Sequence, residues 1–125
     1  MIPKDNIIVV NGTFDNLVVD DLRFLQKSRK QGDWLIVGLN SDIITHMITG
    51  NLLHDYDDRQ EMLQGLKCVD EVMRFEDSDG TSCRLLKMVK LLYPQAVITY
   101  VSKYDMKNMP EAKIRGIKFQ VIDKE

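Results

Sequence analysis

The sequence has few of the residues that mark several common classes of protein. Its only cysteines are Cys68 and Cys83, and neither has a partner cysteine or a histidine at metal-ligand spacing. This argues against a disulfide framework and a zinc site, and it indicates reduced thiols in a cytoplasmic protein. No apolar run approaches the roughly 18 residues that a membrane span requires, so we expect no membrane partner.

An excess of one charge sign is also missing. Lysine and arginine total 17 and aspartate and glutamate total 19, which gives a formal net charge of −2. Such a balance provides no electrostatic attraction to nucleic acid, so we expect no nucleic-acid partner. What the sequence does have is a 44% share of hydrophobic residues in 125 positions, which is typical of one soluble globular domain over residues 1–125.

Short apolar runs alternate with amphipathic stretches along the chain. The runs predict strands at residues 7–10, 34–39, 71–75, 96–101 and 118–122. The amphipathic stretches predict helices at residues 20–30, 57–67, 81–93 and 111–115. Residues 43–56 are hard to assign: the apolar residues between 43 and 48 could form a short helix, which Gly50-Asn51 would break before a loop. This alternation predicts an α/β fold, a Rossmann-like parallel sheet of about five strands with helices on both faces. In such a sheet the ligand crevice lies beyond the carboxyl ends of the strands.

Several blocks of sequence fall at these strand ends and helix starts. They are residues 11–17 (NGTFDNL), residues 32–42 (GDWLIVGLNSD), Asp58-Arg59 and residues 66–72 (LKCVDEV). In this order and spacing the sequence resembles the nucleotidylyltransferase superfamily, which includes glycerol-3-phosphate cytidylyltransferase and the nucleotidyl-transferring domain of ADP-heptose synthase. The resemblance implies a reaction in which a substrate phosphate attacks the α-phosphate of CTP or ATP and expels pyrophosphate. Catalysis in such a reaction consists of positioning and cationic stabilisation.

The resemblance also assigns residues to the nucleotide site. The nucleotide-binding positions are Asn11, Gly12, Thr13, Phe14, Asp15, Asn40, Asp42 and Arg59. In the family, an H-x-G-H motif that opens the first helix contacts the triphosphate. Here its two histidine positions hold Val18 and Asp21, and its glycine position holds Asp20. A carboxylate at a helix N-terminus fills an anion site with the protein's own charge, and at ~4 Å it repels a phosphate by several kcal/mol.

Other departures from the family concern phosphate contacts as well. Thr49 stands where the family places a lysine, and residues 102–105 (SKYD) replace a Lys-Gly-Gly-Asp segment. The Ser-Thr-Thr-type phosphate motif, which the family carries beyond its fifth strand, is not among these 125 residues. Residues that build the framework are kept and residues that touch phosphate are replaced. This pattern predicts a pseudoenzyme without confident catalytic residues.

Three hypotheses for the function follow. We favour a degenerate cytidylyltransferase-like protein that acts through protein contacts, as a homodimer or with another protein. An alternative is an active transferase that moves a CMP or AMP group to a small phosphorylated metabolite. It would hold Mg²⁺ on Asp15, Asp20 and Asp21 and use Arg59 or Lys103 as the cation. A third is a nucleoside or sugar sensor without turnover.

Several of these side chains also have a structural interpretation. Asp15 can fix the turn before the helix by accepting hydrogen bonds from loop amides. Asp20 and Asp21 can act as a helix cap and a first-turn acid. For Arg59 we weigh a place in the nucleotide crevice equally against a pairing with Asp57, with Asp58 or with a neighbouring subunit.

Overall fold

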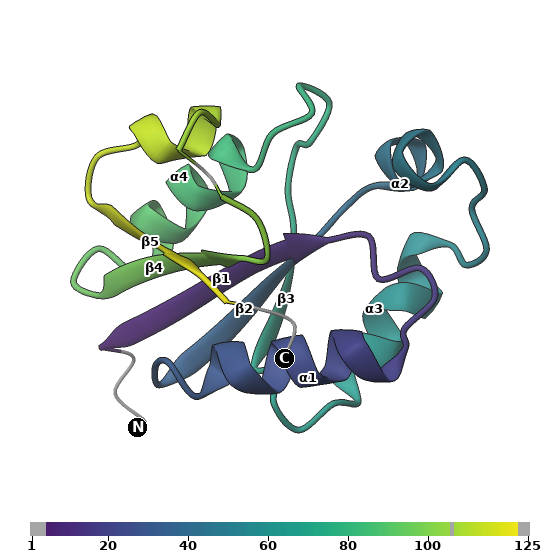
Figure 1. Ribbon diagram of the computed structural model, residues 1–125, viewed down its shortest axis with the longest axis horizontal. Coiled ribbons are helices and arrows are strands. Elements are labelled where there is room, and N and C mark those ends of the chain that lie inside the picture. The colour runs from purple at the N-terminus through teal and green to yellow at the C-terminus, as the bar shows by residue number, and fades with distance from the viewer. Residues whose placement is uncertain (1–4, 106, 123–125) are drawn as a thin grey trace.

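The protein is built on one parallel sheet, seen in a computed structural model that describes residues 5–105 and 107–122. The sheet has five strands in the order β3-β2-β1-β4-β5, and every neighbouring pair is parallel (Figure 1). The strands are β1 Asn6–Gly12, β2 Trp34–Leu39, β3 Glu71–Arg74, β4 Val97–Ser102 and β5 Ile117–Val121. The predicted fold class is confirmed, and each predicted strand lies within a residue or two of its place. The strand order reverses between β1 and β4, and ligands of such sheets bind at that point.

Four helices and one 3-10 turn connect the strands. They are α1 Val19–Arg29, α2 Asp42–Thr49, α3 Tyr56–Gln64, α4 Cys83–Leu92 and the 3-10 helix η1 Pro110–Lys113. The stretch that is hard to assign from the sequence contains α2, which ends at Gly50 in a left-handed conformation with φ of 79°. Glycine adopts this conformation without strain, which explains why the helix ends there. No helix within residues 5–105 and 107–122 is long and apolar enough to cross a membrane.

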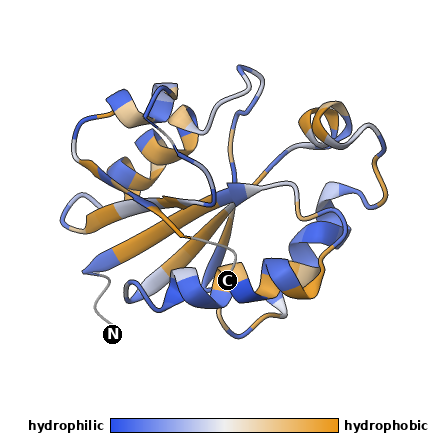
Figure 2. Ribbon diagram, in the orientation of Figure 1, coloured by the Kyte–Doolittle hydropathy of each residue, from blue (hydrophilic) through white to orange (hydrophobic). Residues whose placement is uncertain are grey.

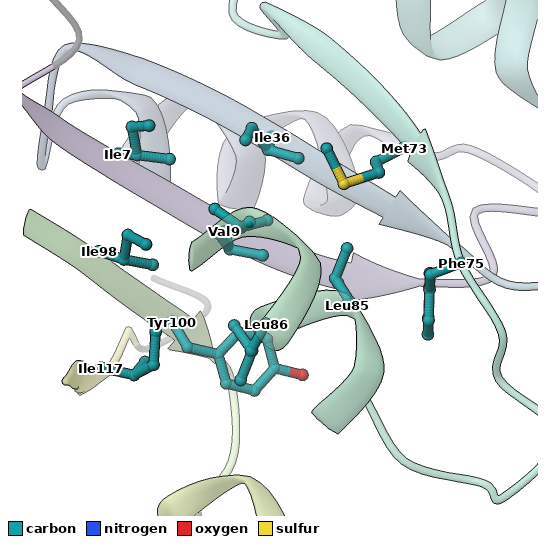
Figure 3. Packing of buried hydrophobic residues seen from close by; sticks show 11 residues of the cluster. Ile7, Val9, Ile36, Met73, Phe75, Leu85, Leu86, Ile98, Tyr100 and Ile117 are labelled. Carbon is teal, nitrogen blue, oxygen red and sulfur yellow. The ribbon is translucent and has the colours of Figure 1, made fainter. Parts of the chain in front are cut away.

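Helices cover both faces of the sheet. Side chains alternate in direction along a strand, so Ile7 and Val9 of β1 face one side while Ile8 and Val10 face the other. On the first side Leu85 of α4 packs over the sheet (Figure 3), where Gly38 of β2 leaves room for it. On the second side lie buried side chains of α1 and α3. Figure 2 shows the resulting apolar strands between more polar helices.

Helix α2 stands apart from these two layers (Figure 1). Its buried residues are Ile44 and Thr45, whereas Ile43, Met47 and Ile48 are 75%, 72% and 66% exposed. A helix that leaves so much apolar surface in water is a candidate for contact with a ligand or a partner.

Candidate functional site

The loop after β1 is shaped by local backbone requirements. Phe14 has a positive φ of 43°, which is uncommon for a residue with a side chain. A Cβ atom on Gly12 would lie 2.7 Å from the Phe14 ring, so a larger residue there would require the ring to move. The Asn11 amide nitrogen donates to the carbonyl of Gly38 at 2.9 Å, and its oxygen accepts from the Ser82 hydroxyl at 3.0 Å. Asn11 thus ties the end of β1 to β2 and to the start of α4.

Asp15 holds a second loop against the first. Its two carboxylate oxygens accept from the backbone amides of Leu53 at 2.7 Å and His54 at 2.8 Å. Burial alone would raise the pKa of the Asp15 carboxyl, but those two amides and the charge of Arg59 outweigh burial and leave the pKa below its ordinary value. Asp15 thus accepts from loop amides as the structural interpretation predicted, but these amides belong to the loop before α3 and not to the turn before α1.

Arg59 is the central polar residue of the site. It is 1% exposed, and each of its three side-chain nitrogens donates a hydrogen bond. Its acceptors are the carbonyls of His54 at 3.0 Å, Thr13 at 2.9 Å and Asn40 at 2.9 Å, the Thr45 hydroxyl at 3.1 Å and the Asp42 carboxylate at 2.6 Å. One guanidinium thus joins the β1 loop, the end of β2, α2 and α3.

One sequence interpretation of Arg59 is corrected here. Its ion pair is with Asp42, not with Asp57 or Asp58 beside it on α3. Side chains one or two residues apart on a helix point in different directions, so the adjacent acids cannot reach the guanidinium. Asp57 lies instead 4.0 Å from Arg74.

The start of α1 carries the residues at the degenerate motif positions. The Val18 amide donates to the Asp21 carboxylate at 3.0 Å, so this side chain caps the helix. The other carboxylate oxygen of Asp21 lies 3.7 Å from the Lys103 ammonium, and Asp20 lies 3.8 Å from Arg23. A negative charge from the protein itself therefore occupies the positive end of α1.

Comparison with known proteins establishes the family. The model of the cytidylyltransferase-like family matches residues 9–122, which is nearly the whole chain. The chain belongs to the cytidylyltransferase-like family. The resemblance drawn from the sequence blocks is thereby confirmed.

Individual relatives of this cytidylyltransferase-like chain are longer proteins. It is 34% identical over 94 residues to the bifunctional protein HldE of Trichlorobacter lovleyi, and 40% identical over 92 residues to that of Helicobacter hepaticus. The matches cover 74% and 70% of this chain but 18% of each relative, so the chain spans less than a fifth of their length. A solved structure, the lipopolysaccharide core biosynthesis protein from Thermoplasma volcanium, covers 95% of this chain and 97% of its own with a TM-score of 0.68. At 23% identity it shows a shared fold.

The eight positions that the resemblance assigns to the nucleotide gather around the carboxyl ends of β1 and β2 and the start of α3. Two polar side chains among them, Asn11 and Asp42, are hydrogen-bonded within the chain. The same holds for Asn40, whose amide donates to Asp77 at 3.0 Å. In this arrangement the hydrogen bonds of these side chains hold together the loops and strand ends that form the crevice.

The carboxylates considered for Mg²⁺ do not converge. Asp15 and Asp21 line one cavity of about 350 Å³, whose lining does not include Asp20. Asp15 uses both oxygens on backbone amides, and Asp20 pairs with Arg23. Over the described residues, no three His, Cys, Asp or Glu side chains are grouped to hold a metal ion. The arrangement does not fit the oxygen-rich shell that Mg²⁺ takes, and Mg²⁺ binding stays a prediction for experiment.

Two polar groups of this region were missed in the sequence. Asp77, beyond β3, is 4% exposed and also accepts from the Ser41 amide at 2.7 Å, which fixes the start of α2. Asp77 lies in an acidic segment at the carboxyl end of a strand, and this position could have identified it in the sequence as a residue of the site. Ser82 is the other, and its hydroxyl lies 2.9 Å from that of Tyr100 while its amide donates to Glu111 at 2.8 Å. Nothing in the local sequence marks that network.

Burial also changes the pKa of the tyrosine in this network. It raises the pKa of Tyr100 to about 12, with the Glu111 charge adding to the effect and the Ser82 hydrogen bond opposing it. The Tyr100 hydroxyl therefore stays protonated at neutral pH. It serves as a hydrogen-bonding group that joins β4 to the start of α4.

Proposed function

We propose that this cytidylyltransferase-like protein no longer transfers nucleotidyl groups and that it acts through protein contacts. The observation that carries the proposal is the Asp21 carboxylate, which caps α1 at the position matched to the family's second histidine. Helix N-termini bind phosphate because free amides and the helix dipole attract an anion. Here the positive end of α1 already attracts the Asp21 carboxylate of the chain itself.

The cations around the crevice support the same proposal. Lys103 is paired with Asp21, and its ammonium lies 4.9 Å over the Phe24 ring. Arg59 is buried and its nitrogens donate to acceptors of the chain. A phosphate about 4 Å from Asp21 would meet repulsion of about 4 kcal/mol from this carboxylate at an effective dielectric of about 20.

Exposed apolar side chains at the same place support protein contacts. Val18 and Val19, at the start of α1, are 51% and 55% exposed. Leu17 and Met62 line one cavity of about 410 Å³ beside them, and Met62 is 60% exposed. Where the family contacts a charged triphosphate, this chain offers an apolar surface of the kind that protein partners cover. A cytoplasmic location fits its cysteines, which are unpaired.

Sedimentation velocity tests the proposed contacts, with self-association as the first form to examine. We expect the wild-type chain to self-associate in the micromolar range, and Val18→Lys or Met62→Lys to shift it to monomer, because each places a charge in the apolar surface. Leu91→Lys is the matched control, since Leu91 is 82% exposed on α4, away from this surface. A wild-type monomer throughout that range, or equal dissociation by Leu91→Lys, would contradict self-association through this surface.

A further inference from the structure

Charge is distributed unevenly along the chain. Residues 83–122 hold eight lysines and arginines against two acids, whereas residues 5–82 hold seven lysines and arginines against fifteen acids. The net charge of −2 therefore hides an excess of positive charge in the last third of the chain, and such an asymmetry indicates a charged partner. The positive third forms α4, η1, β4 and β5 at one edge of the sheet, while the acidic helix α3 lies beside β3 at the other edge (Figure 1).

The outer side of α4 carries much of this positive charge. Arg84 and Lys87 are exposed and three residues apart, so they are neighbours on the helix surface. Lys90, a further three residues along, donates to the carbonyl of Arg115 at 2.6 Å, which brings this exposed arginine of the loop before β5 next to the helix. Lys113 of η1, which packs against α4, is exposed as well. We call these five residues the basic face.

The chain itself does not neutralise the basic face. Over residues 5–105 and 107–122, none of its five side chains forms an ion pair with a carboxylate. Arg84 lies in the first turn of α4, where a cation opposes the helix dipole and where this helix has no acid. The spacing of three residues along α4 also places like charges next to one another. This arrangement disfavours the helix by itself, so we look for its use outside the chain.

An exposed apolar side chain lies among these charges. Leu91 follows Lys87 by four residues and Arg84 by seven, so the three share one stripe of α4. The Leu91 side chain is 82% exposed. A partner that covers Leu91 and presents carboxylates to the two cations gains free energy both from apolar burial and from complementary charge.

A nucleic acid fits this stripe less well than an acidic protein segment does. Helix α4 has ten residues and is roughly 15 Å long, whereas duplex DNA continues with one charge per about 1.7 Å. Hydrogen bonds from Ser78 and Thr81, and then the nearby charge of Arg84, hold the pKa of Glu76 and of Asp79 below its ordinary value. These exposed carboxylates would repel a polyanion that runs past Arg84, but a short segment ends before it reaches them.

We propose that the basic face binds an acidic protein segment that carries an apolar residue between its carboxylates. Carboxylates of the segment pair with Arg84 and Lys87, and its apolar residue covers Leu91. The inference goes beyond the proposed function and does not depend on it, because α4 lies on the opposite face of the sheet from α1. An active transferase could use the same surface.

The test is a fluorescence anisotropy titration with a labelled peptide built of Glu-Glu-Leu repeats. It is made at about 0.15 M salt, where exposed charges more than about 8 Å away are screened. We expect saturable binding of one peptide per chain, weakened at least tenfold by Lys87→Glu. Lys30→Glu is the matched control, since it makes the same change of charge at an exposed position at the end of α1. Its affinity should stay within twofold of wild type.

Two further measurements separate this contact from general charge attraction and from folding. Leu91→Ser should weaken the Glu-Glu-Leu peptide at least threefold and leave the affinity for a Glu-Glu-Ser peptide unchanged. In urea unfolding, the midpoint of Lys87→Glu should lie at or above that of wild type, because the substitution relieves repulsion along α4.

Several results would overturn the inference. They are the absence of saturable peptide binding, an equal loss of affinity in Lys30→Glu, an unchanged affinity of Leu91→Ser for the Glu-Glu-Leu peptide, and a lower urea midpoint for Lys87→Glu. Tighter binding of a DNA oligonucleotide of the same charge, or of phosphatidylserine vesicles, would assign the face to nucleic acid or to a membrane instead. Self-association that Lys87→Glu abolishes would assign it to a second copy of the chain, which also contradicts the proposal.

Discussion

At the scale of single residues, the family's framework positions are kept because they hold the loops of the crevice in place. Arg59 shows this most clearly: it is 1% exposed, and its acceptors come from the ends of β1 and β2, from α2 and from the loop before α3. A buried charge costs free energy unless its partners are in place, so the residues that satisfy it form one unit. The proposed loss of turnover would remove the need for phosphate contacts but not the need for this unit.

We therefore expect Arg59→Met to lower the free energy of unfolding by about 3 kcal/mol or more, because it leaves the Asp42 carboxylate and several carbonyls without their donor. Urea unfolding at neutral pH measures this. Arg23→Met is the control: Arg23 is 60% exposed in its pair with Asp20, and we expect a change within about 0.5 kcal/mol. Equal effects of the two substitutions would show that Arg59 does not organise the crevice.

Asp15 leads to a prediction with a defined pH dependence. Its folded pKa is below the ordinary value of 3.8, so its stabilising effect is complete above that value and is lost as the pH falls through the lower, folded pKa. We expect Asp15→Asn to lower the free energy of unfolding by about 1 to 3 kcal/mol at neutral pH, because an amide group replaces one acceptor oxygen. The difference in the free energy of unfolding between Asp15→Asn and the wild-type protein should shrink below about pH 4.

Urea unfolding at a series of pH values measures that difference. Asp58→Asn serves as control, because Asp58 is an exposed carboxylate on α3. A deficit of Asp15→Asn that stays constant down to strongly acidic pH would contradict the assigned role.

At the scale of elements, the start of α1 distinguishes a structural carboxylate from a functional one. Asp21 caps the helix, faces its positive end and pairs with Lys103. A residue retained for function at a cost to stability usually leaves the protein more stable when it is replaced. Replacing a residue that caps a helix, by contrast, leaves the protein less stable.

For Asp21→Asn we expect a loss of about 0.3 to 1 kcal/mol in the free energy of unfolding, reduced at high salt because the charge interactions are screened. Thermal or urea unfolding at low and high salt measures it. Asp105→Asn is the control, since Asp105 is exposed and belongs to no helix. Increased stability of Asp21→Asn would point to a retained functional charge and would count against the proposed function.

The elements also show what the sequence could and could not predict. The strands were predictable because runs such as Ile7 to Val10 and Trp34 to Leu39 are apolar on both faces and end at polar residues. Helix α2 could be suggested only as one possibility, because it has eight residues and depends on the Ser41 cap and on Asp77, which lies 36 residues from Ser41 in sequence. The pair between Arg59 and Asp42 was missed for the same reason, since it forms only once α2 and α3 are placed.

At the scale of the whole molecule, the fold and family followed from the sequence, whereas the state of the site needed its geometry. The motif residues identified the superfamily, and the substitutions at Val18, Asp20 and Asp21 suggested a lost phosphate site. Only the structure shows that Asp21 caps α1 beside Lys103 and that Arg59 is buried. The Asp21 cap is local and was among the roles that the sequence suggested. The Lys103 pair and the contacts of Arg59 depend on segments that are distant in sequence, so no local pattern could have supplied them.

The central claim is that the crevice no longer binds nucleoside triphosphates, and calorimetric titration with CTP and with ATP, each with Mg²⁺, tests it most directly. The protein should show no heat beyond dilution up to millimolar ligand, because Asp21 places a carboxylate at the start of α1 and the nearby cations are paired. Saturable binding in the micromolar range, about −8 kcal/mol, would contradict the account and show that the phosphate site has been rebuilt from other residues.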